Sequence, residues 1–64
     1  MLDAPNTLLR LPEVLRRTGL SRASLYRLIA ARQFPPQVKI SARSSAWSER
    51  AVQTWIAALL NPAV

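Results

Sequence analysis

Residues 11–31 read LPEVLRRTGLSRASLYRLIAA, and this stretch decides the fold. Side chains in its first half recur at the spacing of one helical face; they are Leu11, Val14, Leu15 and Thr18. Pro12 suits the first position of such a helix, where its missing N–H costs no hydrogen bond. Gly19, the only glycine in the chain, falls where this helix must end, because glycine adopts the left-handed conformation most readily.

A second helix is predicted over about residues 22–31, and Ser21 in front of it is a good N-cap. Its inner stripe consists of Leu25, Leu28 and Ile29, which leaves the other side of the helix to solvent. Two short helices joined by a tight turn that contains a glycine form a helix-turn-helix. The stretch therefore predicts this motif.

A small hairpin, or wing, is predicted after the second helix, which ends at the two prolines of residues 35–36. Residues 38–40 alternate apolar, basic, apolar, as a half-buried strand does. Residues 46–47 are expected to be the returning strand, with a polar turn at residues 41–45. The wing then carries Lys39 on its arm and Arg43 near its tip.

A third helix is predicted after Ser48, its N-cap, with Glu49 in the first turn where a carboxylate complements the helix dipole. Its inner stripe is expected to be Val52, Trp55, Ile56 and Leu59. Residues 8–11 are expected to form an edge strand or a packed extended segment, and residues 1–7 a flexible tail. The predicted fold is one mainly α domain, residues 1–64, with a small β-hairpin: a winged helix-turn-helix with its core at about residues 8–60.

The charge balance points to a nucleic-acid partner. Nine Lys and Arg oppose three Asp and Glu, which gives a net charge of +6 and a pI near 11.8. Such a basic domain has the electrostatic footprint of a nucleic-acid binder. Eight of the nine cations are Arg, whose planar fork of donors matches phosphate oxygens and the guanine edge. A GC-rich genome would also favour arginine, but it does not explain the shortage of acids.

The composition argues against an enzyme. The chain has no Cys and no His, which removes the thiolate nucleophile, the commonest general base and the commonest metal ligands. Asp3 falls in the expected tail, while Glu13 and Glu49 fall in first helical turns, where a structural role is sufficient. We therefore expect no catalytic residue, no metal site and no cofactor.

The expected location is the cytoplasm. A chain without disulfides suits a reducing compartment, and its first residues lack the pattern of a signal peptide. The most apolar stretch, residues 51–60, is about half of the roughly 20 residues that span a membrane. We therefore expect no membrane association and no small-molecule ligand.

The second helix is the candidate recognition helix, the element that contacts base edges. Its outer face presents the small residues Ala23, Ser24 and Ala30, which let a helix enter the major groove, beside Arg22, Tyr26 and Arg27. Ser21 and the first N–H groups of the helix can hold a phosphate. Lys39 and Arg43 of the wing suit phosphates or the minor groove. The alternative is that these are ordinary solvated charges; for Trp47 and Trp55, core packing is favoured over base stacking.

Residues 8–60 resemble the AlpA family of phage and prophage regulators. The most specific segments are TGLSR at residues 18–22, SLYRLI at residues 24–29 and Phe34-Pro35. The resemblance implies a MerR-like winged helix-turn-helix and transcriptional regulation, often of an integrase or excision gene. It implies DNA contacts by Arg22, Ser24, Tyr26, Arg27, Lys39 and Arg43. The chain departs from the family at the wing turn, where Ser41-Ala42-Arg43-Ser44 replaces the usual glycine, so the geometry of the wing tip is left open.

The expected function is sequence-specific binding of double-stranded DNA by a transcriptional regulator. An excisionase that bends DNA for an integrase would use the same surface, and a second copy or an integrase are further candidate partners. A protein-interaction module, such as an antitoxin or antirepressor that docks on an acidic partner, is the alternative from another class. A membrane-active peptide is disfavoured because the cations do not share one helix opposite an apolar face.

Overall fold

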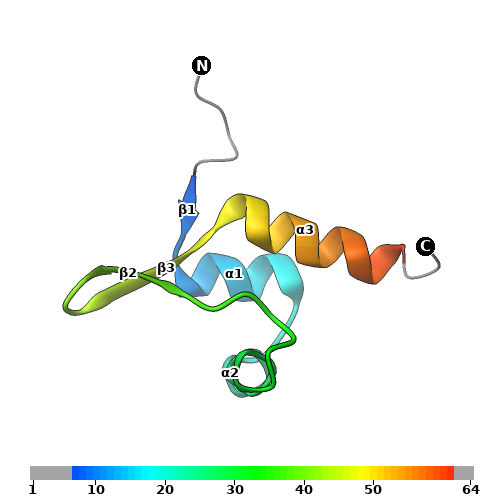
Figure 1. Cartoon of the computed structure of the whole chain (residues 1–64), viewed down its shortest axis with the longest axis horizontal. Coiled ribbons are helices and arrows are strands. Elements are labelled where there is room, and N and C mark those ends of the chain that lie inside the picture. Colours follow the sequence, from blue (N-terminus) through cyan, green and yellow to red (C-terminus); the bar gives the residue numbers. More distant parts are fainter. Residues whose placement is uncertain (1–6, 62–64) are drawn as a thin grey trace.

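The computed structural model describes residues 7–61, which form three helices and three short strands (Figure 1). The elements in chain order are β1 (Leu8–Leu9), α1 (Leu11–Thr18), α2 (Arg22–Ala30), β2 (Val38–Ser41), β3 (Ser44–Ser48) and α3 (Glu49–Leu60). The three helices and the hairpin are those that the sequence predicts, and the segment at residues 8–11 takes the first of its two expected forms, an edge strand, at Leu8–Leu9. The turn predicted at residues 41–45 is shorter than expected, because β2 continues to Ser41 and β3 already begins at Ser44. The tail expected at residues 1–7 lies, except for Thr7, outside the described residues.

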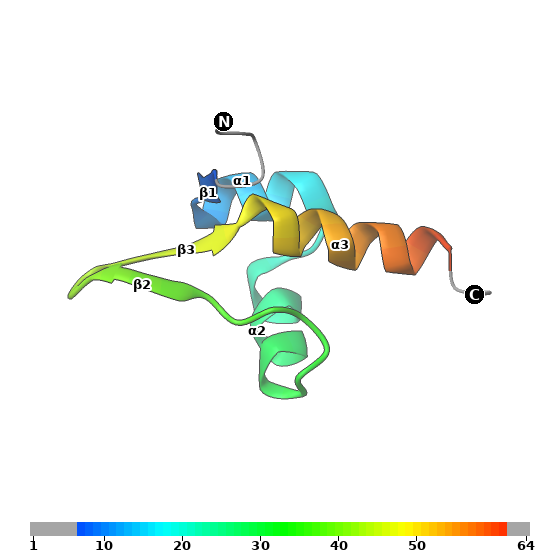
Figure 2. The same ribbon diagram turned by 45° about the horizontal axis from the view of Figure 1, so that its top comes forward.

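The helix-turn-helix forms as predicted, and local hydrogen bonds define both sides of its turn, the end of α1 and the start of α2. Gly19 ends α1 in the left-handed conformation, with φ at 77°, and its N–H donates to the carbonyl of Leu15 at 2.8 Å. Ser21 caps α2, because its hydroxyl oxygen accepts from the N–H of Ser24 at 3.1 Å. Figure 1 views α2 end on, below α1 and α3, and Figure 2 shows that α2 projects away from them.

The sheet is antiparallel and has the strand order β1-β3-β2. Leu9 of β1 lies opposite Trp47 of β3, so the N-terminal strand closes the sheet beside the core. On the other side of β3, Val38 of β2 lies opposite Ala46. The hairpin of β2 and β3 extends beyond the helices as a wing (Figure 2).

The wing tip forms without glycine. Within residues 7–61, positive φ angles occur at Gly19 and Arg32, so the tip residues Ala42 and Arg43 both have negative φ. Tight hairpin turns usually need positive φ values, which match the twist of the strands. Here a register shift between Lys39 and Ser41 accompanies the turn, and the ammonium of Lys39 donates to the carbonyl of Ala42 at 3.3 Å.

The core is small and centred on Trp47, whose side chain is 1% exposed. The other buried members of the cluster are Leu9, Val14, Leu25, Phe34 and Val52. The indole N–H of Trp47 donates to the carbonyl of Pro35 at 3.1 Å, so its burial leaves no unpaired donor. Trp55 packs against this cluster at its edge, in a T-shaped contact with Phe34 at 4.9 Å between ring centroids. Both indoles therefore pack in or against the core, as predicted.

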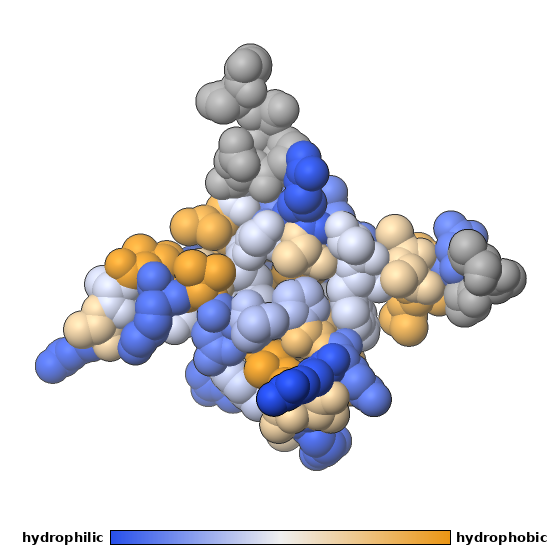
Figure 3. Space-filling view, viewed as in Figure 1, coloured by the Kyte–Doolittle hydropathy of each residue, from blue (hydrophilic) through white to orange (hydrophobic). Residues whose placement is uncertain are grey.

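Two predictions of burial are wrong. Leu59 was expected on the inner stripe of α3 but is 61% exposed, because the C-terminal part of α3 extends past the rest of the core (Figure 1). The strand at residues 38–40 was expected to be half-buried, yet Val38 and Ile40 are each 48% exposed. The reason is that the wing projects away from the helices, and Figure 3 shows hydrophobic surface along it.

Candidate nucleic-acid interface

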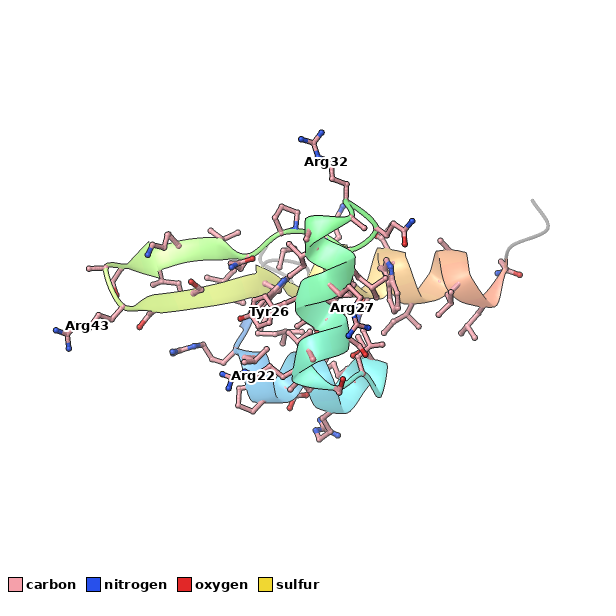
Figure 4. The ribbon with its side chains drawn as sticks, turned by 90° about the horizontal axis from the view of Figure 1, so that it is seen from below. Arg22, Tyr26, Arg27, Arg32 and Arg43 are labelled. Atoms are coloured by element: carbon pink, nitrogen blue, oxygen red, sulfur yellow. The ribbon has the colours of Figure 1, made fainter. Side chains whose placement is uncertain are left out.

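The exposed side of α2 divides into two flanks. Figure 4 looks onto α2 and shows Arg22 and Tyr26 leaving it toward the wing, whereas Arg27 leaves it on the side of α3. All three side chains are exposed, as are the small residues Ala23 and Ala30 on the same helix. A helix with this surface can approach the floor of the major groove closely while its long side chains reach sideways.

Ser21 and Ser24 form a pair at the N-terminus of α2. The Ser21 hydroxyl accepts from the Ser24 N–H and donates to the Ser24 hydroxyl oxygen at 3.0 Å. One hydroxyl proton is therefore used between the two serines, and the other stays available to a ligand. The first N–H groups of α2 also lack helical acceptors, so this terminus suits a phosphate.

The wing carries the two remaining predicted contact residues. Both Lys39 and Arg43 are exposed. Lys39 uses one ammonium donor on the Ala42 carbonyl and keeps two for solvent or a ligand. Arg43 stands at the tip, and its guanidinium points outward from the wing (Figure 4).

The described carboxylates are engaged on α1 and at the start of α3. Glu13 accepts from Arg16 and from Arg17, the latter at 2.8 Å, and these two guanidinium groups lower its pKa to about 2. Arg17 also donates to Glu49 at 2.8 Å, which ties α1 to the first turn of α3. The remaining cations have no ion pair within residues 7–61; they are Arg10, Arg22, Arg27, Arg32, Lys39, Arg43 and Arg50. The positive charge of α2 and the wing is thus left uncompensated by this part of the chain.

A hollow of about 570 Å³ lies between the start of α1, α2 and the wing. Three of the predicted contact residues, Arg22, Tyr26 and Arg43, line it together. Ser21, Ser24, Arg27 and Lys39 do not line it. Tyr26 is oriented there by an edge contact with Trp47, at 6.5 Å between ring centroids.

Arg10 also lines this hollow and is not among the contact residues that the sequence predicts. It precedes α1 and has no place in a helical stripe or in the wing. Its position one residue before the predicted apolar stripe is the signal in the sequence, but Arg10 reaches the same hollow only because α1 packs against β3.

A second hollow, of about 870 Å³, lies on the α3 side of the molecule. Its walls are mostly apolar and include Ile29, Phe34, Pro35 and Trp55, with Arg32 and Arg50 among the lining residues. Apolar walls do not suit the sugar-phosphate backbone, so the hollow beside the wing, which is more polar, is the better nucleic-acid contact. Within residues 7–61, no helix is long and apolar enough to cross a membrane.

The sequence is similar to those of phage proteins. The family described as "Prophage CP4-57 regulatory protein (AlpA)" matches residues 7–60, which include all six elements. An uncharacterized protein of Enterobacteria phage P4, ORF88, is 45% identical over 49 residues. That alignment covers 77% of this chain and 56% of the phage protein, so the chain spans little more than half the length of that relative.

Proposed function

The chain belongs to the AlpA family of prophage regulatory proteins, and from this premise we propose that it regulates transcription by binding duplex DNA sequence-specifically. The regulated gene would be an integrase or excision gene of a prophage or related integrated element. One observation carries the proposal: α2 and the wing present exposed cations that have no ion pair within residues 7–61, beside small side chains on α2. This combination of charge and shape fits a reading helix with a basic wing.

The proposed binding mode places α2 in the major groove. Arg27, on the α3 flank of the helix, would reach base edges, where a guanidinium can donate two hydrogen bonds to guanine. The N-terminus of α2 and the wing would meet the backbone of the duplex. Phosphate contacts fix the position of the helix, whereas base contacts determine which sequence is preferred.

Fluorescence anisotropy with labelled duplexes tests the proposal. The probes are the DNA upstream of the protein's own gene, the promoter of a neighbouring integrase gene, and a shuffled duplex. If four to six phosphates are neutralised, log K should fall against log[salt] with a slope of roughly −4 to −5. A slope near zero, or equal affinity for all three probes, contradicts sequence-specific binding.

An excisionase that bends DNA for an integrase is a second use of the same surface. A circularly permuted duplex separates the two functions, because bending shifts gel mobility according to the position of the site. Bending within an attachment site together with a requirement in excision favours the excisionase. Altered expression from a reporter promoter without such a requirement favours the regulator.

A protein-interaction module is the second candidate function, and the apolar hollow on the α3 side is the observation that favours it. Arg32 and Arg50 at this hollow would attract an acidic partner. This candidate predicts salt-sensitive binding to a protein together with no measurable affinity for duplex DNA. Saturable DNA binding in the anisotropy assay counts against it.

A further inference from the structure

Among the described residues, the side chains that line the hollow between α1, α2 and the wing are all cationic or neutral. Arg10 contributes from the segment before α1, and Arg22 contributes from the first turn of α2. The hydroxyl-bearing residues Tyr26 and Ser45 lie in the same lining. Arg43 completes it from the wing, although its guanidinium extends outward from the tip (Figure 4).

The positive charges of this hollow have no counter-charge among the residues that the structure describes. No carboxylate of residues 7–61 lines it, and the nearest one in sequence, Glu13, is already engaged by Arg16 and Arg17. Neither Arg10 nor Arg22 makes an ion pair within residues 7–61. Two guanidinium groups that share one concave site raise the local positive potential, and an anion placed between them lowers the electrostatic energy.

We infer that this hollow binds one backbone phosphate of duplex DNA, held jointly by Arg10 and Arg22. The inference rests on the proposed function and names one of its contact sites. Guanidinium groups donate pairs of hydrogen bonds to phosphate oxygens, and the Tyr26 and Ser45 hydroxyls are further donors. A volume of about 570 Å³ lies within the range of pockets that hold whole small molecules, so a phosphate fits together with an adjoining sugar.

With this phosphate site, the two flanks of α2 contact different parts of the duplex. Arg22 and Tyr26 on the wing flank grip the backbone and fix the register of the helix on the duplex. Arg27, on the opposite flank, is then left for the base edges. Arg10 is a phosphate-binding residue that is absent from the set of contacts implied by the family resemblance.

The salt dependence of DNA binding tests whether the two arginines share one phosphate. The variants are Arg10→Gln, Arg22→Gln and their double, with Arg50→Gln on α3 as a control that removes the same charge outside this hollow. We expect a roughly tenfold loss of affinity for each single variant on any duplex. If one phosphate is shared, the double variant lowers the magnitude of the salt slope by about 0.9, whereas two separate phosphates give about 1.8.

Duplexes with one neutral methylphosphonate, moved stepwise along the backbone, give an independent readout. At one position the neutral linkage should weaken the natural protein and abolish any further effect of Arg10→Gln and of Arg22→Gln. Arg10→Lys, which keeps a point charge, should retain most of the salt slope. Circular dichroism melting checks folding; both side chains are exposed and make no side-chain hydrogen bond within residues 7–61.

The outcomes separate this inference from the proposed function. If the natural protein has no duplex affinity, the proposed function fails. If it binds DNA but Arg10→Gln behaves like Arg50→Gln, or no methylphosphonate position masks both arginines, the shared phosphate site alone is overturned. Inorganic phosphate is the last probe: saturable binding at these arginines with no effect of methylphosphonates assigns the site to a free anion and overturns its assignment to DNA.

Discussion

Replacing Gly19 by alanine isolates the energetic cost of the corner between α1 and α2. Gly19 has φ at 77°, and a Cβ atom added there would meet no other atom within 4 Å. The cost of the substitution therefore comes from backbone conformation and not from a clash. A left-handed conformation costs an L-residue about 1–2 kcal/mol, while the smaller unfolded-state entropy of alanine returns about 0.4–1 kcal/mol.

The expected net destabilisation is about 1 kcal/mol. In a domain of about 60–100 residues, this lowers Tm by roughly 4–8 °C. The assay is thermal and urea unfolding followed by circular dichroism and tryptophan fluorescence. Gly19→Asn should cost less than Gly19→Ala, because asparagine tolerates this conformation, and Gly19→Val should cost more, because a β-branched residue tolerates it least.

Arg32 provides the reverse experiment on the same molecule. It lies two residues past the end of α2 with φ at 62°, and its N–H donates to the carbonyl of Ile29 at 3.0 Å. The N–H of Gln33 closes the corner by donating to the carbonyl of Leu28 at 2.8 Å. Glycine is the preferred residue at such a helix end, so Arg32→Gly should raise Tm while Gly19→Ala lowers it. An unchanged Tm in Gly19→Ala, or a Tm that rises with side-chain size at position 32, would refute the reasoning.

Three further results are expected. Arg27→Ala should lower the binding free energy by about 1–3 kcal/mol on a preferred duplex and by much less on a shuffled one, whereas Lys39→Ala should weaken binding to both duplexes alike. Anisotropy on the two duplexes measures this, and the opposite pattern would mean that the wing contacts the base edges. Trp47→Ala should destabilise by about 3–5 kcal/mol and Trp55→Ala by less, because Trp47 is fully buried and Trp55 only partly; equal unfolding curves would contradict this. Stability should fall as pH drops from about 4.5 to about 2, because Glu13 has a lowered pKa in the folded state and its ion pairs are lost on protonation; Glu13→Gln should flatten this part of the pH profile, and an unchanged profile would contradict it.

The helix-turn-helix could be predicted because its determinants act over a few residues. A glycine that ends one helix and a serine that caps the next are recognisable in the sequence and form the expected hydrogen bonds. The inner stripes of α1 and α2 follow from helical spacing alone, and Val14 and Leu25 are both fully buried. None of these features requires knowledge of the tertiary structure.

Features that depend on where the core ends could not be predicted. The spacing that places Val52 on the inner side of α3 also selects Leu59, but periodicity does not tell how far the neighbouring elements extend. The same holds for the wing, where alternation predicts burial that a projecting hairpin does not provide. Arg32 in a left-handed conformation is another such case, because the residue type disfavours what the surrounding structure requires.

The two flanks of α2 follow from helical geometry, whereas their roles do not. Residues four apart in a helix differ by about 40° around its axis, so Arg22 and Tyr26 share a flank; residues five apart differ by about 140°, so Arg22 and Arg27 do not. The exposed side of α2 is therefore two flanks and not one face. The sequence does not tell where the wing lies, nor that the packing of α1 against β3 places Arg10, Arg22 and Arg43 around one hollow. Because Arg10 joins the site through this packing alone, a test of Arg10 examines the tertiary arrangement as well as the DNA contact.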